Sequence, residues 1–132
     1  GTKLPDDAGE DSVSLLPLLA GVDEPVRESA VSQSMRGLLS VRKGNWKMIF
    51  GPGSGGWSKG RDEHPGQLYD LSTDLAETTN LYLEKPELVQ QLTSLMQSIV
   101  GDGRSTPGAK QKNDVKVKWR RFLEAQKKPG GD

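Results

Sequence analysis

The sequence contains no cysteine and only one histidine, His64. The lack of cysteine excludes disulfide bonds and thiolate zinc sites, but it leaves the compartment open, because many exported proteins also lack cysteine. No second histidine or cysteine lies within ligand spacing of His64, so the sequence favours a solvated loop residue there, with ligand contact in a complete enzyme as the alternative. No segment approaches the roughly 18 apolar residues that a membrane span needs, so no membrane partner is expected.

Hydrophobic residues are also scarce, at 33% of 132 residues, whereas the chain has 16 glycines and 8 prolines. The length suits about one domain with a modest core, and the glycine and proline content predicts much loop. Basic and acidic residues balance at 18 each, so the whole chain has no net charge to attract nucleic acid. The first residues, Gly1–Pro5, lack signal-peptide anatomy and suggest a chain entered midway.

Charge is unevenly placed. Residues 1–28 carry two basic and seven acidic side chains, whereas residues 104–132 carry nine basic and three acidic ones. We interpret the two ends as solvated segments that attract each other or another part of a larger protein. Nucleic-acid binding by the basic end is the alternative, which the few aromatic residues there disfavour.

Short hydrophobic segments in the middle of the chain predict a sheet. Leu38–Arg42 and Trp46–Phe50 are rich in β-branched and aromatic residues, and Lys43-Gly44-Asn45 supplies a turn between them. Residues 28–34 and 67–71 predict further short strands. Hairpin-length links reverse the chain, so the strands are expected to be antiparallel.

Residues 86–100 predict the one long helix. Pro86 suits the first helical position, Glu87 favours the positive end of the helix dipole, and Gly101 is expected to end the helix. The expected fold is α+β: a small antiparallel sheet of three to four strands packed against one long helix, with a flexible N-terminus and C-terminal tail. One apolar stripe is expected to face the sheet, formed by Leu88, Val89, Leu92, Leu95, Met96 and Ile99.

The flanking segments are harder to assign. Residues 12–20 hold four leucines and predict a helical turn or two, with Ser12 as the N-cap, Pro17 limiting its length and Gly21 ending it. So apolar a segment needs burial on several sides. Residues 115–126 fit both a helix and a strand, and the sequence does not separate these alternatives.

Two local patterns have a structural and a functional interpretation. Gly51–Gly56 matches G-x-G-x-x-G, but residues 57–66 lack helical character, so a flexible surface loop is favoured over a nucleotide site. Trp57, Lys59, Arg61 and His64 would give this loop contact chemistry. The acidic residues Asp70, Asp74 and Glu77 could suggest a cation site, but we expect Asp74 to cap a helical turn over residues 75–79, with Glu77 in capping-box position.

Several segments together resemble a known family. Asp11–Gly21 fits D-S-x-x-L-L-P-x-L-x-G, Val41–Ile49 is similar to a hairpin I-R-x-G-x-W-K-L-I, and Gln67–Leu81 to x-L-Y-D-L-x-x-D-x-x-E-x-x-N-L. Gly103-Arg104-Ser105 is also similar to the ending of that region. In this order the segments resemble formylglycine-dependent, arylsulfatase-like sulfatases of the alkaline phosphatase superfamily, over roughly residues 4–106.

The resemblance implies a C-terminal subdomain. Residues 1–27 would be a partly helical connector from the missing N-terminal catalytic domain, residues 28–101 the α+β subdomain, and residues 102–132 a linker and basic tail. In such enzymes a Cys or Ser of a C/S-x-P-x-R motif becomes formylglycine, whose hydrate attacks sulfur, while calcium neutralises the sulfate oxygens. Calcium, formylglycine and a sulfate ester substrate are thus implied for the parent enzyme, which relatives suggest is exported or periplasmic. This chain lacks that motif, so it is expected to hold no catalytic residue and no metal ligand.

The resemblance also implies a role at the rim of the substrate pocket. Many relatives have His-His or His-Ser at the end of the strand that corresponds to residues 31–34, whereas this sequence has Gln33 there. Arg36 could offer a fork of donors to a sulfate or sugar hydroxyl, although an exposed turn arginine is the alternative. The rim candidates are Gln33, Ser34, Arg36 and His64.

Two functional hypotheses follow. The first is a sulfatase fragment that is structural, shapes the substrate pocket and is inactive alone. The second is an independent protein- or polyanion-binding module, suggested by the basic segment 104–128. An uncovered leucine face at residues 15–19 would promote association, which predicts a homodimer of the fragment, disorder of residues 1–25, or both.

Overall fold

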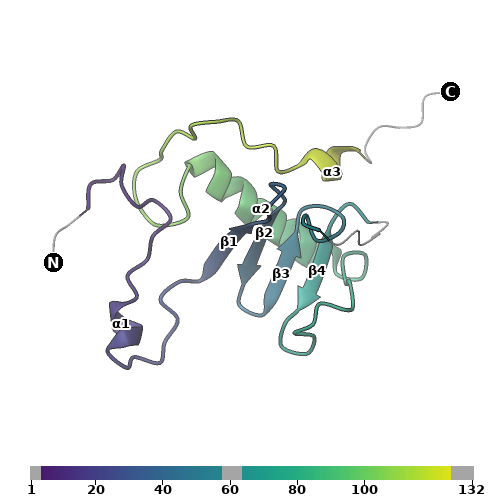
Figure 1. Ribbon diagram of the computed structural model, residues 1–132, viewed down its shortest axis with the longest axis horizontal. Coiled ribbons are helices and arrows are strands. Elements are labelled where there is room, and N and C mark those ends of the chain that lie inside the picture. The colour runs from purple at the N-terminus through teal and green to yellow at the C-terminus, as the bar shows by residue number, and fades with distance from the viewer. Residues whose placement is uncertain (1–3, 58–63, 126–132) are drawn as a thin grey trace.

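A computed structural model describes residues 4–57 and 64–125 of the chain. Its centre is a four-stranded antiparallel sheet with strand order β1-β2-β3-β4, in which every neighbour in space is also the neighbour in sequence (Figure 1). The strands are β1 (Ser29–Gln33), β2 (Leu39–Lys43), β3 (Trp46–Ile49) and β4 (Gln67–Asp70).

The β2–β3 hairpin confirms the predicted turn. Lys43 and Trp46 are the last paired residues, so the loop between them has two residues. Gly44 has φ of +57°, whereas Asn45 is not left-handed, a combination that glycine at the first loop position provides. The hairpin therefore fixes the register in which Val41 pairs with Met48.

The long helix α2 (Pro86–Asp102) begins as predicted and ends two residues later than predicted. Pro86 lies in its first turn together with Glu87. Gly101 was expected to end the helix, but it lies within it, because one glycine only weakens a helix that tertiary contacts hold. The left-handed residue that ends the helix is Gly103, with φ of +63°.

The core lies between α2 and one face of the sheet. Alternation along the strands places Val41, Met48 and Leu68 in one cross-strand row on that face. Each of these three side chains is fully buried. The predicted fold class, a small antiparallel sheet packed against one long helix, is confirmed. The buried cluster consists of Val41, Met48, Phe50, Leu68, Leu92, Met96 and Trp119.

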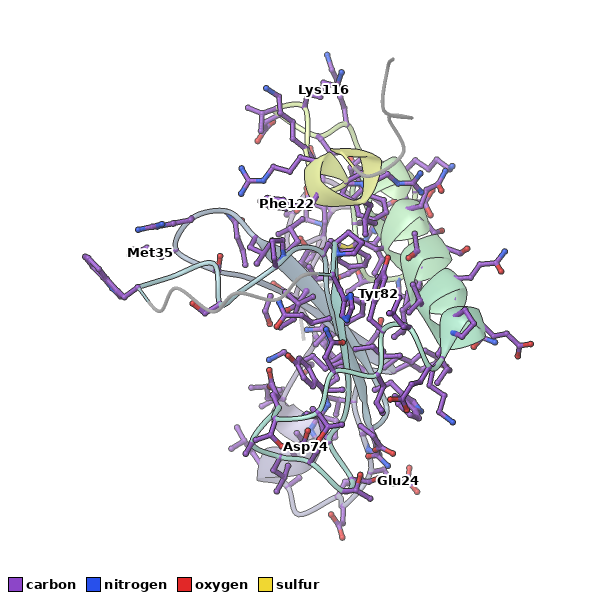
Figure 2. The ribbon with its side chains drawn as sticks, turned by 90° about the vertical axis from the view of Figure 1, so that its right-hand side faces the viewer. Glu24, Met35, Asp74, Tyr82, Lys116 and Phe122 are labelled. Atoms are coloured by element: carbon purple, nitrogen blue, oxygen red, sulfur yellow. The ribbon has the colours of Figure 1, made fainter. Side chains whose placement is uncertain are left out.

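Residues beyond α2 contribute to this core, which settles the question left open for residues 115–126. Residues 115–118 form neither helix nor strand, and α3 (Arg121–Ala125) is a single short helical turn. Trp119 is buried with its ring edge-on to Phe50, at 4.9 Å between centroids and 83° between planes. Figure 2 shows α3, marked by Phe122, at the upper end of the sheet. The division of the chain at residues 27 and 101 stays a prediction.

The leucine-rich segment forms α1 (Leu16–Leu19), the short turn predicted around Pro17. The predicted cap at Ser12 is wrong, because the residue preceding the helix is Leu15 and no side chain caps the turn. Leu16 and Leu19 are 72% and 82% exposed, so the described residues leave the apolar surface of α1 open. Among residues 4–57 and 64–125, no helix is long and apolar enough to cross a bilayer.

Candidate functional site

Three of the four predicted rim residues lie together at the turn between β1 and β2. Gln33 ends β1, and the turn closes where the Ser34 N–H donates to the Leu38 carbonyl at 2.8 Å and Ser34 Oγ accepts from the Leu38 N–H at 3.0 Å. The Arg36 N–H donates to the carbonyl of Gly55 at 3.1 Å, which ties this turn to the glycine-rich loop. Both Gln33 and Arg36 are exposed and can present amide and guanidinium donors.

The glycines of residues 51–57 serve close packing in this structure. A Cβ on Gly55 would lie 2.3 Å from Ser34 Oγ, and a Cβ on Gly51 would lie 2.4 Å from a methyl carbon of Leu38. Residues 51–57 form bends, and the first helix after them along the described chain is α2. A phosphate cradle needs a helix to begin at the glycine turn, so the loop interpretation is the one that fits.

A buried polar network that we did not predict supports the glycine-rich loop. The Gln67 side-chain amide donates to the carbonyls of Gly51 at 2.7 Å and Gly53 at 2.9 Å, and its oxygen accepts from the Tyr69 hydroxyl at 2.8 Å. Gln67 and Tyr69 are each only 6% exposed. The signal was present in the sequence, because two polar-tipped residues two positions apart on one strand share a face.

The tip of this rim is apolar. Met35 and Trp57 are 65% and 84% exposed, at the β1–β2 turn and at the end of the described part of the glycine-rich loop. Figure 2 shows the turn that carries Met35 projecting from the sheet on the side away from α2. Lys59 and Arg61, which were expected to give the loop contact chemistry, lie outside the described residues.

No interaction described in this structure joins His64, the fourth rim candidate, to the β1–β2 turn. Its ring stacks on Tyr82, with 6.5 Å between centroids and 12° between planes. Burial raises the pKa of the Tyr82 hydroxyl above its ordinary value of 10.0, because the charged form loses solvation. Of the four rim candidates, Gln33, Ser34 and Arg36 thus lie at the β1–β2 turn beside residues 51–57, and His64 stacks on Tyr82 at the far end of the loop.

The acidic turn after β4 is structural, as predicted, but by different contacts. Asp74 accepts hydrogen bonds from the N–H groups of Thr78 and Thr79, both at 2.8 Å, and these bonds lower the pKa of its carboxyl. Residues 75–79 form no helix. Glu77 is not in a capping box, because its backbone is left-handed with φ of +56° and its carboxylate pairs with Lys47 at 2.6 Å.

The Asn80 side chain makes hydrogen bonds to backbone groups of β4 and of the turn, as a neighbouring strand would do. Its Oδ1 accepts from the N–H groups of Leu68 and Tyr82, both at 3.0 Å, and its Nδ2 donates to the Gly66 carbonyl at 3.3 Å. The Leu81 N–H then donates to the Leu68 carbonyl at 2.8 Å. The spaced residues of the segment Gln67–Leu81 are thus explained as supports of β4 and its turn.

The residues present do not fit a calcium site. Asp70 Oδ1 accepts from the N–H and hydroxyl of Ser72, and both oxygens of Asp74 are occupied by backbone donors. Hard cations need several oxygens that converge on one point. Within the described part of the chain, no group of three His, Cys, Asp or Glu side chains could hold a metal ion.

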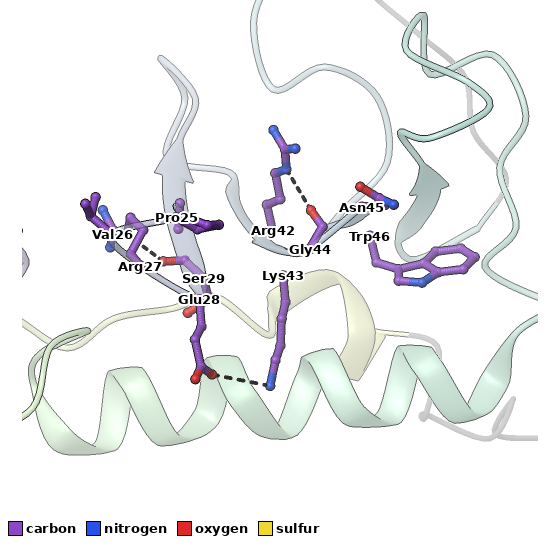
Figure 3. A pocket seen from close by; sticks show the side chains of 11 residues that line it. Pro25, Val26, Arg27, Glu28, Ser29, Arg42, Lys43, Gly44, Asn45 and Trp46 are labelled. Carbon is purple, nitrogen blue, oxygen red and sulfur yellow. Dashed lines mark hydrogen bonds and ion pairs between the residues drawn. The ribbon is translucent and has the colours of Figure 1, made fainter. Parts of the chain in front are cut away.

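A groove lies at the opposite end of β1 and β2 from the β1–β2 turn. It is an open groove of about 940 Å³ between residues 25–30 and residues 42–46 (Figure 3). The Nε atoms of Arg27 and Arg42 are each tied to a nearby carbonyl, at 2.6 Å and 3.0 Å, and Lys43 lies 4.0 Å from Glu28. The groove was not among the predicted sites.

Comparison with known proteins identifies relatives of this fold and sequence. No protein-family model matches the chain. The N-acetylgalactosamine-6-O-sulfatase of Bacteroides thetaiotaomicron is 41% identical over 102 residues, which are 73% of this chain and 20% of that enzyme. The choline-sulfatase of Rhizobium meliloti is 38% identical over 74 residues, which are 54% of this chain and 12% of that enzyme.

A solved structure gives the same result in three dimensions. It is a sulfatase from work on glycosaminoglycan metabolism by Bacteroides thetaiotaomicron, with a TM-score of 0.62, 36% identity, and coverage of 74% of this chain and 21% of that one. The chain thus spans about a fifth of the length of the N-acetylgalactosamine-6-O-sulfatase and of the solved structure, and less of the choline-sulfatase. By sequence and by fold, this chain is similar to a part of these sulfatases, which agrees with the expected sulfatase subdomain.

Proposed function

We propose that this chain is the C-terminal part of a sulfatase, that it forms one wall of the substrate pocket, and that it is inactive alone. The observation that carries the proposal is the match, at 41% identity to about a fifth of a sulfatase sequence and at 36% identity to about a fifth of a solved sulfatase structure. The partner is the catalytic portion of the enzyme, which supplies formylglycine and calcium, and the substrate is a sulfate ester.

The rim at the β1–β2 turn supports the pocket-shaping role. Its exposed groups are donors, the amide of Gln33 and the guanidinium of Arg36, which suit a sulfate or a sugar hydroxyl. The turn that carries them is fixed by bonds to Leu38 and to Gly55, and the loop of Gly55 is held by buried Gln67. A donor on a fixed turn binds with less loss of entropy than one on a free loop.

The exposed leucines of α1 support the proposal that the catalytic portion of the enzyme is the partner. Leu15, Leu16, Leu18 and Leu19 are all exposed on one short turn, and Val22 follows them. Clustered apolar side chains of this kind mark a surface that another protein body covers. Since relatives carry most of their length outside the matched region, we assign this surface to the catalytic portion.

Hydrolysis of an aryl sulfate tests the inactivity. The purified chain with added calcium should show no turnover above buffer, because it contains no cysteine and no C/S-x-P-x-R motif. Turnover that survives repurification would overturn the proposal.

The pocket-wall role is tested in the intact sulfatase. Arg36→Ala should raise KM for the sulfate ester by about tenfold, the effect of losing one charge-assisted hydrogen bond. Arg42→Ala is the matched control, since Arg42 lies at the opposite end of the sheet, in the groove. Equal KM values for the two variants would argue against a contact between Arg36 and the substrate.

A second candidate function rests on basic residues around Trp119. Lys116 and Lys118 are exposed on either side of half-buried Val117, and this segment could bind a polyanion. Deletion of residues 107–132 would not test this, because it removes Trp119 from the core. The better test is heparin retention at rising salt, where Lys116→Glu with Lys118→Glu should elute earlier and Lys85→Glu, at the residue that precedes α2, should not. No retention of the wild-type chain would exclude this function.

A further inference from the structure

The N-terminal segment of the chain is tied to the loop that follows α2. The Asp6 carbonyl accepts from Arg104 Nη1 at 3.2 Å and from the Gln111 side-chain amide at 3.1 Å. The Glu10 carbonyl accepts from the N–H of Thr106 at 3.2 Å and from its hydroxyl. Figure 1 shows the two segments crossing beside the C-terminal end of α2. We call these contacts between residues 5–11 and residues 103–111 the clasp.

Arg104 organises the loop side of the clasp. Its Nε donates to the Thr106 carbonyl at 2.9 Å, its Nη1 to the Ala109 carbonyl at 2.9 Å, and its Nη2 to the Thr106 hydroxyl at 3.3 Å. The planar guanidinium therefore joins both halves of the loop from within. The curled loop then turns the N–H groups of Ser105 and Thr106 toward the N-terminal segment.

Two glycines make this arrangement possible. A Cβ on Gly108 would lie 2.3 Å from Nη1 of Arg104, and a Cβ on Gly103 would lie 2.2 Å from the carbonyl oxygen of Gln111. The Gln111 N–H donates to the Asp102 carbonyl at 2.8 Å and closes the loop onto the end of α2. Gly103 and Gly108 therefore leave the space that the Arg104 guanidinium and the closed loop require.

The clasp binds the N-terminal segment more through its backbone carbonyls than through its charged side chains. Asp6 and Glu10 are held through their carbonyls, and only Asp11 uses its carboxylate, which accepts from the Ser105 N–H at 2.8 Å. The described contacts between the acidic N-terminal segment and this loop are therefore mainly hydrogen bonds to main-chain carbonyls of a segment that is folded into turns. Arg27 adds a contact from the other side of α1, because its Nη2 donates to Ser105 Oγ at 3.3 Å.

We propose that the loop 103–111 is the binding surface for an acidic segment that is folded into turns, the chain's own residues 5–11, and that Arg104 is the positioning residue that shapes it. Because the clasp holds the chain on both sides of α1, through Asp6–Asp11 and through Arg27, it fixes the direction in which the leucines of α1 face. The further consequence, that the clasp orients the catalytic portion bound to these leucines, rests on the proposed function. The clasp itself does not rest on it.

Hydrogen exchange on the full chain, followed by mass spectrometry, tests the clasp. Arg104→Ala should speed exchange about tenfold at the amides of Ser105 and Thr106 and in residues 8–12, and it should leave residues 88–96 of α2 unchanged. Arg104→Lys should not restore protection, since an ammonium group cannot bridge both halves of the loop. Arg120→Ala is the matched control, because Arg120 bonds Gln97 and lies away from the clasp.

A second pair of variants covers the case in which Arg104→Ala disturbs the whole fold. Asp11→Ala removes the acceptor for the Ser105 N–H and should speed exchange there, whereas Asp11→Asn keeps an oxygen at Oδ1 and should not. Unchanged exchange at Ser105 and Thr106 in folded Arg104→Ala, or equal exchange in the two Asp11 variants, would overturn the proposal. Neither readout needs sulfatase activity, so a failure here is distinct from a failure of the proposed function.

Discussion

The sheet with α2 and the N-terminal segment of residues 4–28 are held together in different ways. The sheet and α2 enclose fully buried side chains such as Met48 and Met96. The N-terminal segment encloses none, exposes the leucines of α1, and is fastened to residues 104–111 by hydrogen bonds to its carbonyls and to the Asp11 carboxylate. One region can be stable by its own packing, while the other presents apolar surface that its own contacts do not cover.

The largest expected change in the free energy of unfolding distinguishes the sheet and α2 from the N-terminal segment. Met96→Ala removes a fully buried side chain and should lower the free energy of unfolding by about 2–5 kcal/mol, because it leaves a cavity. Leu16→Ala, on exposed α1, should change it by less than about 0.5 kcal/mol. Urea denaturation followed by circular dichroism measures both. Similar losses in the two variants would mean that α1 is part of the core.

A smaller effect should show that the turn after β4 belongs to the stable region. Asn80→Ala removes two acceptor bonds and one donor bond, and it should cost about 2 kcal/mol. Asn80→Asp keeps the acceptor oxygen and loses the donor, so its loss should be smaller. Thermal melts of the two variants make the comparison, and an Asp variant as unstable as the Ala variant would contradict the assigned roles.

Two ion pairs sharpen the contrast further. Lys47 Nζ lies 2.6 Å from Glu77 Oε1, and these side chains are 28% and 29% exposed. Lys43 Nζ lies 4.0 Å from Glu28 Oε2, at the end of the N-terminal segment, and these side chains are mostly exposed. Glu77→Gln should cost about 1 kcal/mol, and Glu28→Gln should have no measurable effect. The same urea titration at low salt compares them. A larger loss for Glu28→Gln would reverse the comparison.

The smallest effect is a pH dependence at Asp74. Backbone N–H groups of Thr78 and Thr79 hold its pKa below the ordinary value of 3.8, so the ionised carboxylate stabilises the folded state. This contribution is present above pH 3.8 and is lost as the pH falls through the lowered pKa. The stability advantage of wild type over Asp74→Asn should therefore shrink on acidification. A difference that stays constant from pH 6 to pH 2 would contradict this cause.

Periodic features were predictable from the sequence, because each is set by local chemistry. The β2–β3 hairpin followed from alternation around Gly44, and α2 from its apolar stripe behind Pro86. The exact end of α2 was not predictable, since the choice between Gly101 and Gly103 depends on the loop that Gln111 closes.

Several missed features join residues that are distant in sequence. Trp119 enters the core only because the chain returns along α2, and Glu77 pairs with Lys47 across 30 positions. The clasp joins residues about 100 positions apart. At the rim, the sequence placed Gln33, Ser34 and Arg36 at one turn, but their partner Gly55 follows from tertiary packing.

We infer that the leucines of α1 form a surface for another protein body, while the sheet and α2 are complete without it. Sedimentation velocity of the chain and of a Leu16→Gln, Leu19→Gln variant distinguishes this from a chain that needs no such partner. The wild-type chain should associate as its concentration rises, and the variant should remain a monomer with an unchanged unfolding transition. A wild-type chain that sediments as a single monomer at every concentration, identical to the variant, would contradict the claim.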